Sequence, residues 1–181
     1  MIKGNKVYLS SIERASLETL RNWRNNEDLR SYFREYREIS CDMQNMWYEK
    51  RVLNNDHQID FEIRKLSDQK LIGHCSLNYI NWINRTAEFG IYVGDENEKG
   101  KGFGSEALRL LIKYGFEEIN LNKIWCEVYE HNQAMGIYKH IGFVHEGTLR
   151  QNYYHKGKYL DSHILSILKD EFLNFKEKKE I

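Results

Sequence analysis

Three glycines at alternate positions, Gly100, Gly102 and Gly104, stand directly before an apolar helical pattern. Without side chains at these positions, the backbone can approach a ligand closely. Free amides at the start of the following helix would point outward, where the helix dipole favours an anion. This stretch therefore predicts main-chain binding of a phosphate or pyrophosphate, although a tight strand-to-helix turn would explain the same glycines equally well.

Glu88 is a second candidate for chemistry, because it is an acid within an otherwise apolar strand pattern. A carboxylate held there could accept a proton as a general base. The alternative is an exposed carboxylate on the polar face of the strand, or one paired with Arg85. Glu127 and His74 are weaker candidates for the same role. The seven histidines show no spacing typical of metal ligands, and we expect no metal.

The elements that must position these groups follow from hydrophobic periodicity. Helical spacing begins after Ser16, and apolar residues recur every three or four positions from Ala107 to Ile119, which predicts an amphipathic helix. No linker or repeat interrupts the chain, so residues 1–181 are expected to form one domain, with a helical or frayed tail over 170–181. The other expected helices are 27–33, 41–53 and 132–140, and the expected strands are 6–10, 59–66, 70–80, 85–94, 123–129, 142–149 and 159–169.

The overall charge and the cysteines exclude several classes of protein. Lys plus Arg and Asp plus Glu are balanced at 27 each, so neither nucleic acid nor an anionic membrane is an expected partner. No run approaches the ~20 apolar residues of a membrane span, and no secretory signal is evident. Cys41, Cys75 and Cys126 are odd in number and form no Cys-x-x-Cys motif, which favours free thiols and a cytoplasmic protein.

Two motifs together carry a family resemblance. Residues 99–104 read Lys-Gly-Lys-Gly-Phe-Gly, and residues 132–143 read Asn-Gln-Ala-Met-Gly-Ile-Tyr-Lys-His-Ile-Gly-Phe. The first is similar to the glycine turn of the GNAT superfamily of acyl-CoA N-acyltransferases, with Lys99 where that family has Arg or Gln. The second resembles the family pattern Asn-x-x-Ala-x-x-x-Tyr-x-x-x-Gly-Phe. Residues 85–94 and 147–150 resemble the branch that holds ribosomal-protein and spermidine N-acetyltransferases, and 20–25 also resembles acetyltransferases of amino-sugar nucleotides.

The resemblance implies the GNAT fold, an α/β (α+β) domain. Its central sheet is mixed, largely antiparallel, of about seven strands, splayed in the middle and covered by helices on both faces. The implied reaction is direct attack of an amine on acetyl-CoA in a ternary complex, without a metal. The implied acetyl-CoA-binding residues are Ile91, Tyr92 and Val93 at the pantetheine, Lys99, Gly100, Lys101, Gly102, Phe103, Gly104 and Ser105 at the pyrophosphate, and Asn132.

Three of the residue roles that the resemblance implies have alternatives. Tyr138 matches the family tyrosine that donates a proton or a hydrogen bond to the CoA sulfur, and the alternative is a core aromatic. Asn132 could instead cap a helix, and both roles can hold together. Lys101 could add a point charge at the pyrophosphate or be merely solvated. Glu88 would serve as the general base, directly or through water.

The acceptor amine is left open by the sequence. By resemblance, its site is built from 23–48 and 153–159. Glu35 and Glu38 suit a polyamine, whereas Arg24, Arg34 and Arg37 suit a phosphate-bearing acceptor such as an amino-sugar nucleotide. A protein N-terminus is a third acceptor, and a solvated helix face would explain the same charges. The alternative to an enzyme is a non-catalytic domain that binds acetyl-CoA as a sensor or scaffold. Exposed aromatics or a strand edge could support a homodimer.

Overall fold

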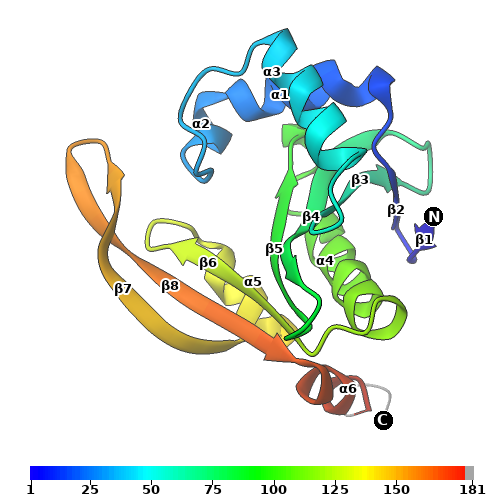
Figure 1. Cartoon of the computed structure of the whole chain (residues 1–181), viewed down its shortest axis with the longest axis vertical. Coiled ribbons are helices and arrows are strands. Elements are labelled where there is room, and N and C mark those ends of the chain that lie inside the picture. Colours follow the sequence, from blue (N-terminus) through cyan, green and yellow to red (C-terminus); the bar gives the residue numbers. More distant parts are fainter. Residues whose placement is uncertain (178–181) are drawn as a thin grey trace.

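The computed structural model describes residues 1–177 and contains one eight-stranded sheet with the order β1-β2-β3-β4-β5-β6-β8-β7 (Figure 1). Neighbouring strands are antiparallel except β5 and β6, which run parallel. The strands are β1 (Ile2–Lys3), β2 (Val7–Ser11), β3 (Ile59–Lys65), β4 (Leu71–Asn81), β5 (Thr86–Val93), β6 (Lys123–Tyr129), β7 (Val144–His155) and β8 (Lys158–Leu168).

Helices cover both faces of the sheet, as the resemblance implied. On one face α4 packs against β2, β4 and β5, and its apolar stripe joins the main core. On the other face α1 and α3 form a smaller core around Leu20 and Tyr48. The helices are α1 (Leu17–Asn25), α2 (Glu27–Arg30), α3 (Cys41–Trp47), α4 (Phe103–Lys113), α5 (Ala134–Ile141) and α6 (Lys169–Glu177). None of the described helices is long and apolar enough to cross a membrane.

The centre of the sheet is splayed. The parallel strands β5 and β6 pair only at their beginnings, where Thr86, Ala87 and Glu88 lie opposite β6. Beyond Glu88 the two strands separate, while each keeps its antiparallel partner on the outer side. The predicted splay is therefore confirmed, and it leaves the inner backbone edge of the second half of β5 unpaired with β6.

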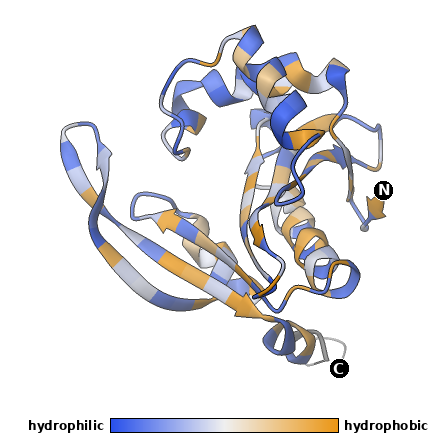
Figure 2. Ribbon diagram, in the orientation of Figure 1, coloured by the Kyte–Doolittle hydropathy of each residue, from blue (hydrophilic) through white to orange (hydrophobic). Residues whose placement is uncertain are grey.

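Hydrophobic and hydrophilic residues alternate along strands of the sheet (Figure 2). In β3, β4 and β5 this alternation gives the sheet two different faces. Apolar side chains face α4 and form the main core, namely Ile63, Cys75, Leu77, Ala87 and Phe89. The face under α1 and α3 carries buried polar side chains instead, namely Asp60, Glu62, His74, Ser76 and Glu88. Buried polar groups require partners, so this second face is where a site is expected.

The sheet has eight strands, whereas the resemblance implied about seven. The additional strand, β1, has two residues, which is too short for alternation to reveal it. The last hairpin is also longer than predicted, because β7 continues to His155 and turns through Lys156 and Gly157, both with positive φ. Of the predicted tail, α6 covers the part up to Glu177, and the remainder lies outside the described residues.

Candidate active site

The glycine turn lies between β5 and α4. Gly100 and Gly102 have φ values of +75° and +84°, the left-handed region that favours glycine, and Gly102 caps the start of α4. A Cβ at Gly100 would meet nothing within 4 Å, so this backbone is open. Within the part of the chain that the structure describes, no amide from Gly100 to Ser105 donates a hydrogen bond. These amides are therefore available to an anionic ligand.

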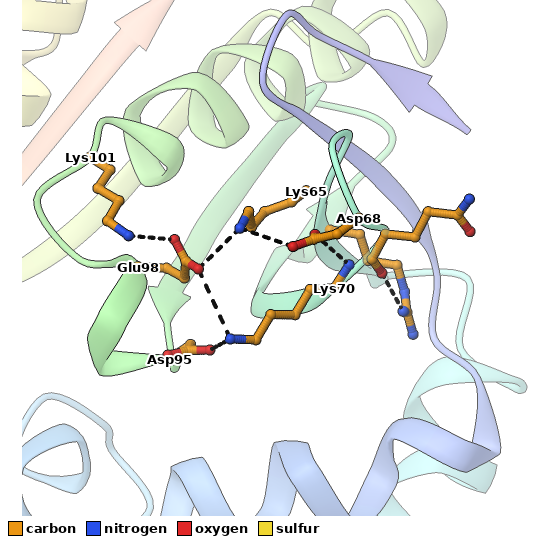
Figure 3. A network of polar contacts seen from close by, with 8 residues as sticks. Lys65, Asp68, Lys70, Asp95, Glu98 and Lys101 are labelled. Atoms are coloured by element: carbon orange, nitrogen blue, oxygen red, sulfur yellow. Dashed lines mark hydrogen bonds and ion pairs between the residues drawn. The ribbon is translucent and has the colours of Figure 1, made fainter.

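The two lysines of the turn are already paired with acids, and Figure 3 shows the pair that Lys101 forms with Glu98. Lys101 Nζ lies 3.0 Å from Glu98 Oε2, and Lys99 pairs with Glu96. Glu98 also accepts a hydrogen bond from Lys65 at 3.1 Å, which ties the turn to β3. Lys101 is thus neither freely solvated nor an unpaired charge, and the turn presents its backbone rather than its side chains.

A cavity of about 470 Å³ passes between the separated halves of β5 and β6. Its wall combines residues from the polar face of the sheet with residues of α5, which lies on the opposite side. Six of the predicted site residues contribute to this wall, namely Glu88, Ile91, Tyr92, Val93, Asn132 and Tyr138. The residues of the glycine turn do not contribute, and Lys101 and Phe103 lie at a separate shallow hollow. A ligand that reaches both places must extend along β5.

Tyr138 projects from α5 toward the splay and is buried. Its ring meets that of Phe89 edge to face, with 5.1 Å between the ring centroids. Burial raises the pKa of the Tyr138 hydroxyl, so the phenol keeps its proton at neutral pH and can donate it. Asn132 lies one residue before the N-cap position of α5, and its side-chain oxygen accepts a hydrogen bond of 2.9 Å from the Ala134 amide, the first of the helix.

Glu88 is buried and is held by Arg34, not by Arg85. The Arg34 guanidinium donates two hydrogen bonds to the Glu88 carboxylate, at 2.6 and 2.9 Å. It donates a third, at 2.8 Å, to Glu127 on β6. One arginine from the segment between α2 and α3 therefore bridges the two strands at the point where they separate. The bidentate geometry fixes the position of the Glu88 carboxylate in the cavity wall.

Glu127 is the second carboxylate of this bridge. It accepts hydrogen bonds from Ser162 at 2.7 Å and from Asn152 at 2.8 Å, besides the one from Arg34. Burial opposes ionisation of Glu127, but these three donors outweigh it and hold its pKa below the ordinary value. Glu127 is therefore ionised at neutral pH.

His74 lies on the cavity wall opposite the splay, next to the ring of Tyr92. Its Nε2 lies 2.9 Å from Asp60, and Arg51 approaches the same carboxylate at 3.3 Å. Burial would raise the pKa of Asp60, but His74 and Arg51 lower it below the ordinary value. Because His74 is bonded to this buried carboxylate, the cluster has a structural explanation as well as a catalytic one.

The segment that follows α2 contacts the last hairpin, β7–β8, across the cavity. The Tyr153 hydroxyl donates a hydrogen bond of 2.6 Å to the Ser31 carbonyl. The Tyr32 ring stacks on His131 with 5.1 Å between centroids, and Tyr153 stacks on Tyr129 at 3.8 Å. These contacts bring 23–48 and 153–159 together at one mouth of the cavity, where the resemblance places the acceptor.

The main feature that the sequence did not predict is the Arg34 bridge. Arg34 was one of several charges on a presumed helix face, yet it contacts acids 54 and 93 residues away. No local pattern in the sequence signals such a contact. Among the described residues there is no group of three or more His, Cys, Asp or Glu side chains that could hold a metal.

Comparison with known proteins agrees with this architecture. Residues 6–144 match the model of the Acetyltransferase (GNAT) domain family. The chain is 33% identical to spermidine N(1)-acetyltransferase of Vibrio cholerae, over 96% of this chain and 99% of that protein. It is 29% identical to the Escherichia coli K12 protein of the same name, over 96% of this chain and 91% of that protein.

A solved structure of the Vibrio cholerae spermidine N-acetyltransferase, in complex with CoA and spermine, superposes with a TM-score of 0.86. It is 33% identical in sequence, and the superposition covers 93% of this chain and 98% of that one. The family model covers residues 6–144, and a relative that is 33% identical matches over 96% of this chain. The chain belongs to the GNAT acetyltransferases.

Proposed function

We propose that this acetyltransferase moves the acetyl group of acetyl-CoA directly to the primary amine of a small molecule. The observation that carries the proposal is the single cavity that reaches Glu88 on one face of the sheet and Tyr138 on the other. The reaction needs a base for the amine and an acid for the leaving thiolate. Two groups on opposite sides of the β5–β6 gap meet this need when the thioester lies between them.

In the proposed step, the amine nitrogen forms a bond to the thioester carbonyl carbon, and the carbon–sulfur bond breaks. Glu88 accepts the proton that the amine loses, directly or through a water. Tyr138 donates its proton to the CoA thiolate. Arg34 acts as a positioning residue, because its bidentate hydrogen bonds fix the Glu88 carboxylate.

We propose that backbone groups, rather than side chains, bind acetyl-CoA, the acetyl donor. The amides of Gly100 to Ser105 would bind the pyrophosphate, and the inner edge of Ile91 to Val93 would bind the pantetheine. Two observations support this assignment: the amides of the turn are unbonded among the described residues, and β5 is unpaired with β6 beyond Glu88. Asn132 would place its side-chain amide beside the same ligand while its side-chain oxygen holds the Ala134 amide.

Spermidine is the first acceptor to test, because two relatives are named for it. Amino-sugar nucleotides and peptides with free N-termini complete the screen. A related structure is described as dodecameric, so self-association of this chain is also proposed, with light scattering as its test.

The test of the function is CoA thiol release from acetyl-CoA by the purified protein, with each amine added in turn. We expect release that depends on the amine and a product that gains one acetyl group by mass spectrometry. Binding of acetyl-CoA without transfer to any amine would contradict the proposal and would favour a sensor.

A further inference from the structure

Every acidic side chain around the cavity has a cationic partner, but one of the arginines has no acidic partner in direct contact among the described residues. Three carboxylates line it, those of Glu35, Glu88 and Glu127. Glu88 and Glu127 share the guanidinium of Arg34, as described above. Both acids at the splay therefore already have a cationic partner, at distances of 2.6 and 2.8 Å. A cationic ligand would have to compete with Arg34 for them.

The remaining acids near the cavity are matched in the same way. Glu35 receives two hydrogen bonds from the Arg37 side chain, at 2.7 and 2.8 Å, and this lowers the pKa of Glu35 to about 2. Asp60, behind the wall, is bonded to His74 and Arg51. No carboxylate among these is left without a cation.

Arg24 is the exception among the arginines of the cavity wall. It lies in the last turn of α1, is half-buried, and covers the ring of Phe33 with its guanidinium 5.4 Å from the ring centroid. Within the described part of the chain it forms neither an ion pair nor a hydrogen bond. Burial has the largest influence and lowers the pKa of Arg24, and the like charge of Arg51 acts in the same direction. Tyr92, Glu35 and Asp60 raise the pKa through longer-range attraction, which does not outweigh burial. A guanidinium cannot escape this cost by losing its proton at neutral pH.

We infer that Arg24 binds an oxyanion, a carboxylate or a phosphate, that the acceptor carries in addition to its amine. This inference rests on the proposed function and names the acceptor class for it. A guanidinium matches either oxyanion with two parallel hydrogen bonds. The anion would give Arg24 a directly hydrogen-bonded partner of opposite charge and would offset the cost of burying part of its guanidinium.

The two ends of such an acceptor have adjacent anchors. Phe33 lies under Arg24, and the next residue, Arg34, holds Glu88. The anion at Arg24 and the amine at Glu88 are therefore positioned by one short segment of chain. A polyamine has no group for Arg24, and its cations beyond the reacting amine would meet carboxylates that already have partners. The acceptor of this chain thus differs in charge from spermidine, for which the relatives are named.

The test uses pairs of amines that differ in the anion. Phosphoethanolamine is compared with ethanolamine, ε-aminocaproate with hexylamine, and spermidine serves as the anion-free polyamine. Thiol release gives kcat and KM for each amine with the wild type, Arg24→Gln, Arg24→Lys and the control Arg14→Gln. Arg14 is an exposed arginine outside the cavity wall. The two pairs distinguish a phosphate from a carboxylate.

We expect the wild type to prefer the anionic member of at least one pair by more than about tenfold in kcat/KM. Arg24→Gln should abolish this preference through the KM of the acceptor, with the KM of acetyl-CoA unchanged. Arg24→Lys should keep part of it, because the charge remains without the planar fork. Arg14→Gln should behave as the wild type.

Two results overturn the inference and leave the function standing: transfer to spermidine without any preference for anionic amines, or a preference that survives Arg24→Gln. A rise in the KM of acetyl-CoA alone in Arg24→Gln would also overturn it, because Arg24 would then serve the donor. Transfer to none of the amines, with acetyl-CoA bound, overturns the function and the inference together.

Discussion

The two ends of the site are built in different ways. At the glycine turn, a short continuous segment presents backbone amides, and its lysines are tied to neighbouring acids. Under α1 and α3, the site consists of side chains from several elements that are far apart in the sequence, and Arg34 holds two of them in place. A main-chain site tolerates exchange of side chains, whereas a side-chain site changes its ligand with a single substitution. If the turn binds the donor and the side-chain site binds the acceptor, as proposed, substitutions could change the acceptor without affecting the donor.

The largest effect is expected at Glu88. Glu88→Gln removes the proposed base and should lower kcat by about a hundredfold or more, with little change in CoA affinity. The matched variant is Glu127→Gln, which removes the other acid bound by Arg34 but leaves Glu88 in place. Steady-state kinetics and calorimetry with CoA measure the two quantities. Equal losses in both variants would mean that Glu88 serves only to hold Arg34.

Tyr138→Phe should have the next largest effect, a fall in kcat of more than about tenfold. The ring is retained, so the contact with Phe89 and the stability should be preserved. Tyr114→Phe is the control, because that tyrosine packs on Phe61 away from the cavity. A Tyr138→Phe enzyme with the wild-type rate would exclude the hydroxyl as the acid.

At the donor end, a change of backbone conformation should affect CoA binding alone. Gly102→Ala places a Cβ at φ +84°, which costs about 1 kcal/mol and should raise the dissociation constant of CoA about fivefold. Gly157→Ala is the matched control, with φ +85° and nothing within 4 Å of an added Cβ at the tip of the last hairpin. Both variants should lose similar stability, but only the first should lose affinity. Equal affinities would argue against a role of the turn in CoA binding.

The smallest effect concerns the aromatic stack that joins the acceptor end to the hairpin. Burial lowers the pKa of His131, and the nearby His155 lowers it further. The folded protein therefore favours the neutral ring, and its stability should fall as the pH drops below the ordinary histidine value of about 6.5. His131→Phe can stack but cannot titrate, so it should flatten this dependence. An NMR titration midpoint of His131 at or above 6.5 would contradict the prediction.

The contrast between a continuous local segment and a site built from distant residues also decides what can be predicted from the sequence. Gly100 to Gly104 and Asn132 to Phe143 are local motifs, and from them the GNAT family, its splayed sheet and its helices on both faces were predicted correctly. The additional strand β1 was not predicted, because two residues carry no periodicity. Nor was the partner of Glu88, since Arg34 reaches it only through the tertiary fold. Side-chain pairs across 54 or 93 residues leave no trace in a single sequence.

A crystal structure of this chain with CoA bound would test the proposed site most directly. We predict the pyrophosphate on the amides of Gly100 to Ser105 and the pantetheine along the inner edge of β5. The thiol should lie within hydrogen-bond distance of the Tyr138 hydroxyl, with Glu88 facing the same point from the other side. A CoA molecule bound outside the β5–β6 gap, or a thiol remote from Tyr138, would contradict the proposed site.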